Sequence, residues 1–190
     1  MNYRIERSWQ SIDYPCAIIL SYELGFRCGY VGVPEGHALH GVHYNEVTHK
    51  LSGYWDLVAS QRMVTMNCMT QNLGIFPTFI AMFSNTDPLQ PSYSIGVHGG
   101  ITYSEPSGSY PVLKQDYWWF GYDCGHVGDG KEIAVINNPM VRAMYETHLT
   151  PKGTIRTTEY CFYECIKLAD QLRAIDKEYK KRKGLLFKKF

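Results

Sequence analysis

The chain has 190 residues, of which 45% are hydrophobic and 14% aromatic, and this composition excludes an intrinsically disordered protein. No run of residues approaches the about 18 consecutive apolar side chains of a membrane-spanning helix, so no membrane span is expected. Residues 1–10 include Arg4, Glu6 and Arg7 without an apolar stretch, which predicts that they are not a secretory signal. The six cysteines, none in a C-x-x-C pair, are therefore expected to be reduced thiols.

The formal net charge of +1 conceals an uneven distribution along the chain. Residues 1–176 contain 12 Lys/Arg and 17 Asp/Glu, a net charge of −5, whereas residues 177–190 contain 7 and 1, a net charge of +6. An acidic body lacks the clustered cations that bind phosphates, which argues against duplex nucleic acid as a partner. Residues 177–190 are interpreted as a solvated basic tail, with contact to an anionic surface as the alternative. Four apolar side chains near its end could contact a second copy of the chain in a homo-oligomer: Leu185, Leu186, Phe187 and Phe190.

A β-hairpin is predicted in the first part of the chain. Residues 15–20 and 27–33 are short apolar runs of strand length, and the segment 23–25 between them contains a glycine suited to a turn. A polar loop with His37, His40 and His43 follows the second strand, and histidine-rich loops can bind zinc. Residues 45–92 mix apolar and turn-forming stretches and are interpreted as an insertion that covers one side of the core.

The second half of the chain predicts more strands and then helices. Residues 93–97 and 101–104 are strand-like, and residues 117–122 carry the strongest strand signal. Asn138 and Pro139 form a capping pair that opens a helix, and an apolar stripe predicts a long helix over residues 158–180. Strands followed by a long helix predict an α+β fold, with an antiparallel sheet and the C-terminal helix packed on one face. Residues 1–176 are expected to form a single domain.

The loop after residues 117–122 contains the strongest candidate for chemistry, Asp123-x-x-His126-x-x-Asp129, interleaved with glycines. Two carboxylates that bracket an imidazole can orient the ring and raise its pKa, as a general acid–base requires. The same groups are plausible ligands for a divalent metal, which the pattern permits without requiring it. In the structural alternative, the aspartates only accept hydrogen bonds from backbone amides of the loop.

A second candidate is His98, which precedes Gly99 and Gly100. Glycines beside a polar side chain allow the backbone to approach a ligand closely, although the pair could equally form a plain hairpin turn. All these loops follow strand ends, so we expect their side chains to converge on one site. The predicted catalytic residues are His98, Asp123 and His126. The predicted ligand-binding residues are His37, Asp129 and three aromatic residues that could stack a base, Tyr30, Tyr103 and Trp119.

Three segments resemble a family of small uncharacterised proteins that are common in tailed phages and prophages. They read CGYVGVPEGH at 28–37, VHGGITYS at 97–104 and WWFGYDCGHVGD at 118–129. The family's motifs are GYVGVPxGHP, VHGGLTY and WWFGFDxAHxGD, followed by a C-terminal helix with a pair like Glu164-Cys165. The resemblance covers residues 27–44, 95–130 and 159–172. The chain departs from the family in a longer segment between His43 and Val97 and in its basic tail.

The resemblance implies a phage setting and a location in the cytoplasm of the bacterial host, but no biochemical activity. Small phage proteins with a polar site often cleave or sequester nucleotide immune signals of the host, an analogy of setting rather than of site. The main hypothesis is therefore an anti-defence protein that binds and hydrolyses a small nucleotide-type phosphodiester with His and Asp acid–base groups. The alternatives are a non-catalytic sponge for such a signal and a structural or protein-binding phage accessory.

Overall fold

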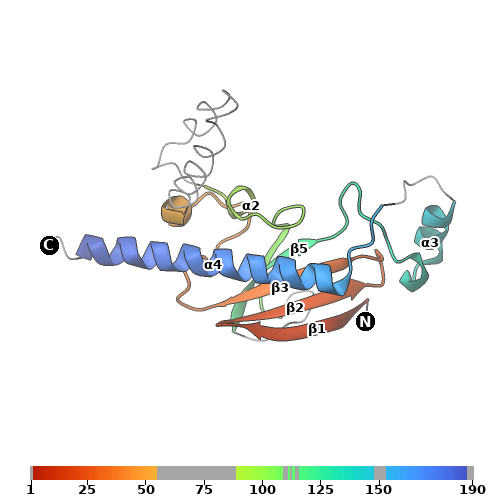
Figure 1. The fold of residues 1–190 in the computed structure, drawn as a ribbon, viewed down its shortest axis with the longest axis horizontal. Helices are drawn as coiled ribbons and strands as arrows, with labels where there is room; N and C mark the ends of the chain where they lie inside the picture. Colours follow the sequence, from red (N-terminus) through yellow and green to blue (C-terminus); the bar gives the residue numbers. More distant parts are fainter. Residues whose placement is uncertain are drawn as a thin grey trace, which may run out of the picture.

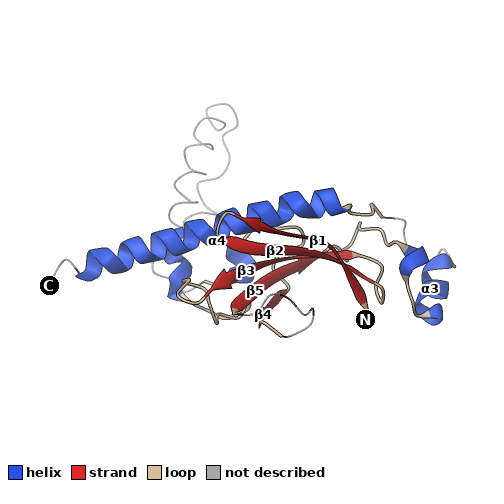
Figure 2. Ribbon diagram, turned by 90° about the horizontal axis from the view of Figure 1, so that it is seen from below, coloured by secondary structure: helices blue, strands red, loops and turns tan. Residues whose placement is uncertain are grey.

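The computed structural model describes residues 2–54, 89–108, 111, 113, 116–147 and 153–187, with the side chains of 185–187 excepted. Five strands form one antiparallel sheet in the order β1-β2-β3-β5-β4 (Figure 1; β4 is labelled in Figure 2). Their bounds are β1 Tyr3–Ser11, β2 Tyr14–Ser21, β3 Arg27–Pro34, β4 Tyr103–Pro106 and β5 Tyr117–Asp123. The predicted hairpin is confirmed, because β2 and β3 pair antiparallel from Cys16–Val31 to Leu20–Arg27.

The long helix α4, Thr158–Phe187, crosses one face of this sheet (Figure 2). Six residues of its buried stripe are fully enclosed: Cys161, Cys165, Leu168, Ala169, Leu172 and Ile175. The stripe packs against Ile18, Val31 and Phe120, which the sheet presents on that face. This arrangement confirms the predicted α+β fold. Within the described part of the chain, no helix combines the length and apolar character needed to cross a membrane.

The shorter helices are α2 Pro91–Ser94, α3 Pro139–Glu146 and the 3-10 turns η1 His49–Leu51 and η3 Ile133–Val135. Asn138 caps α3 as predicted, because its side chain accepts hydrogen bonds from the backbone N–H groups of Met140 and Val141. The start of α4 has a similar cap, in which Thr157 Oγ1 accepts from the Tyr160 N–H at 3.1 Å. Both helices therefore begin where a polar side chain can satisfy amides of the first turn.

The helix α4 extends beyond its predicted end at residue 180, so the boundary between residues 176 and 177 lies inside one continuous helix. Asp176 accepts a hydrogen bond from the Ala38 N–H at 2.8 Å, and Tyr179 packs against the core. The first turn of the basic segment is thus attached to the body. The apolar side chains at 185–190, for which the sequence suggested a contact with a second copy, lie outside the described side chains.

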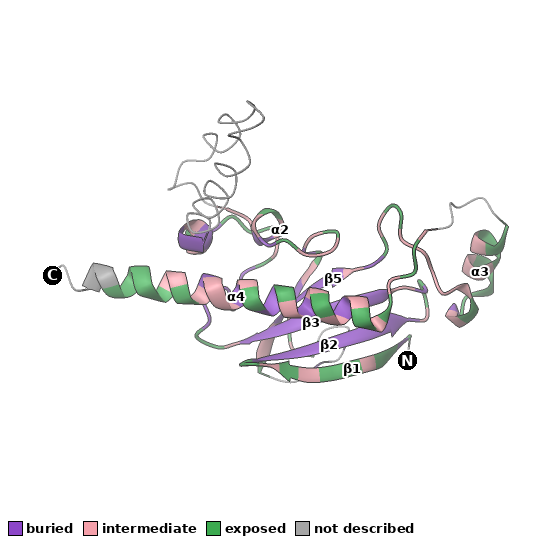
Figure 3. Ribbon diagram, in the orientation of Figure 1, coloured by how far each residue is buried: buried purple, intermediate pink, exposed green. Residues whose placement is uncertain are grey.

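The strands β2 and β3 are buried along almost their whole length (Figure 3). A second apolar cluster contributes to this burial, because large side chains of the sheet pack against one another on the face opposite α4. Its members are Tyr3, Ala17, Ile19, Cys28, Tyr30, Leu113 and Trp119. With both faces covered, a central strand becomes a continuous apolar run instead of an alternating one.

Three features differ from the sequence-based prediction. The edge strand β1 was not predicted. Residues 93–97 do not form a strand, because 93 and 94 belong to α2, which begins at Pro91, where proline suits the first helical turn. The strand expected at 101–104 begins at Tyr103 instead. The predicted insertion 45–92 is closed at its base by a pair of hydrogen bonds between Thr48 and Leu89, while residues 55–88 lie outside the described part.

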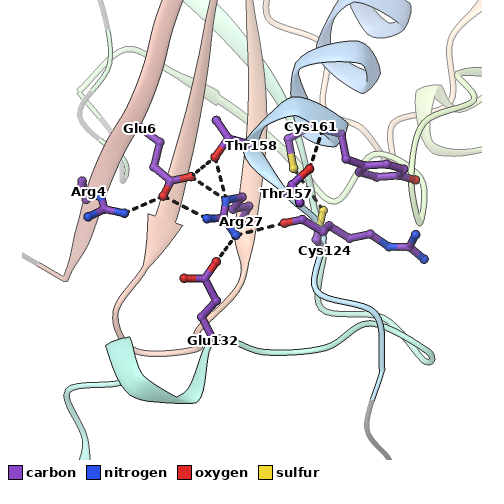
Figure 4. Close-up of polar contacts among 10 residues, drawn as sticks. Arg4, Glu6, Arg27, Cys124, Glu132, Thr157, Thr158 and Cys161 are labelled. Atoms are coloured by element: carbon purple, nitrogen blue, oxygen red, sulfur yellow. Dashed lines mark hydrogen bonds and ion pairs between the residues drawn. The ribbon is translucent and has the colours of Figure 1, made fainter.

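A buried ion-pair network joins the sheet to the start of α4 (Figure 4). The Arg27 guanidinium donates to both carboxylate oxygens of Glu6 at 2.6 and 3.1 Å, and their side chains are only 9% and 8% exposed. Arg27 also donates to Glu132, to Thr158 Oγ1 and to the backbone carbonyl of Arg156. One side chain on β3 therefore binds β1, the N-cap residue of η3 and the residues around the start of α4.

Candidate functional site

His98, His126 and Asp129 form a compact cluster between the loop after α2 and the loop after β5. The ring centroids of His98 and His126 are 5.6 Å apart at an interplanar angle of 72°. Asp129 Oδ2 lies 2.7 Å from His98 Nε2 and 3.9 Å from His126 Nδ1. The two motifs that were singled out separately in the sequence thus meet, and we refer to these residues as the His98–His126–Asp129 cluster.

The carboxylate of Asp129 is the centre of the cluster. Its side chain is 1% exposed, and Oδ2 accepts hydrogen bonds from His98 Nε2 and from the backbone N–H of His126 at 3.0 Å. Oδ1 accepts from Arg156 Nε at 2.8 Å. Burial by itself raises the pKa of Asp129, but the hydrogen bonds from Arg156 and His98 outweigh it and hold the pKa below its ordinary value. Asp129 is therefore a carboxylate that orients the side chains of His98 and Arg156 and holds the backbone of His126.

His98 is held on both sides of its ring. Nε2 meets Asp129, and Nδ1 lies 2.9 Å from the hydroxyl of Tyr160 on α4. The backbone N–H of His98 donates to Glu164 Oε2 at 2.7 Å, one helical turn further along. A neutral ring with its proton on Nε2 satisfies both contacts, because the tyrosine hydroxyl then donates to Nδ1. His98 is thus fixed in orientation by α4 and only 12% exposed.

His126 is the more accessible imidazole, with 35% of its side chain exposed. Its Nδ1 atom is nevertheless buried and has no hydrogen-bond partner among the described residues. Asp123 Oδ1 is 3.6 Å away, too far for a hydrogen bond, and accepts instead from the Gly125 N–H at 2.9 Å. Asp123 Oδ2 accepts from Thr102, so Asp123 shapes the loop in the way that the structural alternative predicted.

The close approach of His126 to the neighbouring loop depends on Gly99. A Cβ atom at this position would lie 2.0 Å from His126 Cε1 and 2.3 Å from Nδ1. Gly99 also has φ +65°, a left-handed conformation that favours glycine. The His98-Gly99 dipeptide therefore supplies one member of the cluster and makes room for another.

Two cationic side chains flank the cluster. Arg156, which binds Asp129, also lies over the Tyr160 ring at 4.9 Å from the centroid. Lys131 lies over the Phe26 ring at 4.1 Å. Burial lowers the pKa of Lys131, although Asp123 and Asp129 act in the opposite direction. Arg156 thus places positive charge beside Asp129, and Lys131 interacts electrostatically with Asp123 and Asp129, so both cations can help to attract an anionic ligand.

His37 does not belong to this cluster. Its Nε2 donates to the backbone carbonyl of Leu172 at 3.0 Å, its Nδ1 accepts from the Leu39 N–H at 3.0 Å, and the residue is 6% exposed. On α4, Leu172 lies more than three turns beyond Tyr160, about 18 Å along the axis of an α-helix. The expectation of a single site that includes His37 is therefore not met, because this ring attaches the loop after β3 to α4.

The aromatic residues expected to stack a base lie on the other face of the sheet. Tyr30 and Trp119 are 5% and 2% exposed in the second apolar cluster. Tyr103 packs edge-on against Tyr30 at a centroid distance of 5.3 Å. Strand alternation explains their position, because the residues next to them on β3 and β5 face α4. The structure does not bring these three side chains to the histidines.

Three residues of the site were missed by the sequence analysis as functional groups: Arg156, Tyr160 and Glu164. Tyr160 and Glu164 are four residues apart and share one side of α4, next to the apolar stripe. That spacing could have drawn attention to them. Arg156 lies in an irregular segment before the helix, where no periodic pattern marks a side chain.

Comparison with known proteins adds no relative, since no family model, curated protein or solved structure matches this chain. The interpretation of the site therefore depends on the chemistry of its own residues.

Proposed function

We propose that this chain is a phage accessory protein that binds a small nucleotide-type phosphodiester at the His98–His126–Asp129 cluster and hydrolyses it. Its setting would be the cytoplasm of the bacterial host, where it would act against a nucleotide immune signal. The motif resemblance alone supports the phage setting. One observation supports the chemistry: a partly exposed imidazole, that of His126, lies beside a fixed second imidazole and a buried carboxylate.

The proposed reaction uses His126 to move one proton. A water oxygen forms a bond to phosphorus while one water proton passes to the imidazole. The bond between phosphorus and the leaving oxygen breaks, and that oxygen takes up the proton from the imidazolium. Proton transfer of this kind contributes about 10²- to 10⁴-fold to the rate. Arg156 and Lys131 would balance the charge that develops on the phosphoryl oxygens.

The test is incubation of the full chain with a panel of cyclic and linear nucleotides, followed by chromatography. New products that appear in excess over the protein support an enzyme. Depletion of a nucleotide in proportion to protein, reversed on denaturation, indicates a sponge. Neither binding nor turnover across the panel would overturn both readings and favour a structural accessory.

Three variants assign the roles within the site. His126→Ala is expected to lower turnover by about 10²- to 10⁴-fold with little change in binding. His98→Ala should weaken both binding and rate, whereas Asp123→Asn should act more weakly, because Asp123 only shapes the loop beside His126. Normal turnover in His126→Ala would remove this residue from the mechanism.

A sponge is the second candidate, and the contacts of the cluster favour it in one respect. Both ring nitrogens of His98 and both carboxylate oxygens of Asp129 already have hydrogen-bond partners. This is expected of side chains that keep the site in shape and do not themselves transfer protons. For a sponge, the same three variants change affinity alone.

A further inference from the structure

We propose that the His98–His126–Asp129 cluster binds one divalent metal ion of the zinc type, through His98 Nε2, His126 Nδ1 and Asp129 Oδ2. Across the described ranges of the chain, this is the one group of three metal-ligating side chains whose ligand atoms all lie within 4.8 Å of one another. The inference deepens the proposed function in that it uses the same side chains, but metal binding can be measured without any nucleotide.

Two of the three separations between these atoms are close to those of a metal-ligand set. Ligand atoms at about 2.0–2.2 Å from a tetrahedral zinc ion are about 3.3–3.6 Å apart. In the structure, Asp129 Oδ2 lies 2.7 Å from one histidine nitrogen and 3.9 Å from the other. Binding would therefore widen the first separation and shorten the second by less than about 1 Å each. Shifts of that size lie within reach of side-chain rotation.

The unpartnered Nδ1 of His126 is the second, independent observation. This atom is buried, and no described residue satisfies it. A buried imidazole nitrogen without a partner is unfavourable, so its burial beside Asp129 requires an explanation. A metal ion between His126 and Asp129 supplies the missing partner and replaces the long contact with two coordination bonds.

The atoms behind the proposed ligands are also arranged as in known metal sites. Metal-binding histidines and carboxylates usually have their remaining polar atoms hydrogen-bonded, which fixes the orientation of each ligand. Here Arg156 holds Asp129 Oδ1 at 2.8 Å, and Tyr160 holds His98 Nδ1 at 2.9 Å. When His98 Nε2 releases its proton to bind metal, Nδ1 carries the ring proton and donates it to the Tyr160 oxygen.

The ligand set indicates what such an ion would do. Two imidazoles and one carboxylate leave a fourth position open, which is typical of catalytic zinc sites and not of closed structural ones. A water molecule in that position is activated by the metal. In the metal-loaded protein, His126 is then a ligand, and the activation of water passes from its imidazole to the ion.

The loop with His37, His40 and His43 was the other zinc site suggested by the sequence, and its geometry is less suitable. Both ring nitrogens of His37 bind backbone groups. His43 Nε2 lies 4.0 Å from Glu105 Oε1, and its side chain is 48% exposed. His43 is thus a suitable control, because it is an accessible histidine beside a carboxylate but outside the cluster.

The experiment is a calorimetric titration of the full, chelator-treated chain with zinc chloride, repeated with Co²⁺ to record its visible absorption. We expect one equivalent of metal per chain. His126→Gln and Asp129→Asn should each lower the zinc affinity more than about 100-fold, because each removes a ligand. Tyr160→Phe removes only a hydrogen bond to a ligand, so it should lower the affinity by about 10- to 100-fold. His43→Gln should bind zinc like the unaltered protein, and circular dichroism checks that each variant is folded.

The outcomes separate the metal site from the proposed hydrolysis. Unchanged zinc affinity in His126→Gln, or a loss confined to His43→Gln, overturns the metal site. Nucleotide turnover by chelator-treated protein that binds no zinc refutes the metal site and leaves the proposed function. One equivalent of zinc held by His126 and Asp129 without turnover supports the metal site and refutes hydrolysis.

Discussion

Replacement of Arg27 by methionine should destabilise the fold more than any surface charge change, because it removes the cation of a buried ion pair. The substitution Arg27→Met keeps an apolar stem of similar length but leaves the Glu6 carboxylate without its bidentate partner. That carboxylate is 8% exposed and keeps only the bonds from Arg4 and Thr158, both at 2.7 Å. The same change also frees the backbone carbonyl of Arg156 next to the site.

The structure sets the size of the effect. Removal of one partner from a buried ion pair costs about 3–5 kcal/mol. Because Arg4 and Thr158 still satisfy part of the Glu6 carboxylate, we expect about 3 kcal/mol, the lower end of that range. For a chain of this length such a loss lowers the melting temperature by about 6–12 °C. Unfolding in urea, followed by circular dichroism, gives the free energy directly.

A double variant and a surface control make the reasoning refutable. In Arg27→Met/Glu6→Leu the buried Glu6 carboxylate is removed together with its cation, so this protein should recover a large part of the lost stability. Arg173→Met, which breaks an exposed pair with Asp170, should change stability by less than about 1 kcal/mol. A loss below about 1 kcal/mol for Arg27→Met, or a double variant as unstable as the sum of both single changes, would show that the network contributes little.

The network also predicts a dependence on pH. Burial by itself raises the pKa of Glu6, but hydrogen bonds from Arg27, Arg4 and Thr158 outweigh it and place the pKa below its ordinary value. A depressed carboxyl pKa stabilises the fold above the ordinary value, and that contribution is lost as the pH falls through the folded value. Arg27→Met should therefore lose less stability than the unaltered protein between about pH 5 and pH 3, measured by urea unfolding at each pH.

Three further changes test other parts of the structure. Burial lowers the pKa of His37, although the Leu172 carbonyl opposes this, so the neutral ring stabilises the fold fully above about pH 6.5 and less as the pH falls below that value. From about pH 7 to pH 5 the unaltered protein should therefore lose more unfolding free energy than His37→Gln. An equal change of unfolding free energy with pH in the two proteins would contradict this role of His37. Ile12 is 61% exposed and has φ 56°, a left-handed conformation that is unfavourable for a β-branched residue and favourable for glycine. Ile12→Gly should therefore raise the unfolding free energy, measured in urea, by about 1 kcal/mol. A lower unfolding free energy in this variant would refute backbone strain at Ile12. Gly99→Ala should lower zinc affinity in calorimetry as much as His126→Gln, because the new Cβ would displace the His126 ring, and unchanged affinity would show that the ring can move at no cost.

Much of the fold could be predicted because its elements carry local patterns. The apolar runs of β2 and β3, the cap at Asn138 and the stripe of α4 each reflect the spacing of one element. The strand β1 was missed because it is a largely exposed edge strand that contains three charged residues, Arg4, Glu6 and Arg7, and has a register shift between Ile5 and Arg7. The strand conformation of β1 depends on its pairing with β2, and the sequence of β1 by itself carries no pattern that predicts this pairing.

The candidate site also has a part that the sequence determined and a part that only the tertiary structure decided. The sequence by itself determined that His98, His126 and Asp129 stand in glycine-rich loops, where polar side chains are free to serve a ligand. Only the tertiary structure decided which loops meet: α4 crosses the sheet so that Tyr160 reaches His98, while Leu172 holds His37 about 18 Å further along the helix. The physical reason is that loop chemistry is local, whereas the distance between loops follows from strand order and from the rise of a helix, which involve residues far apart in the chain.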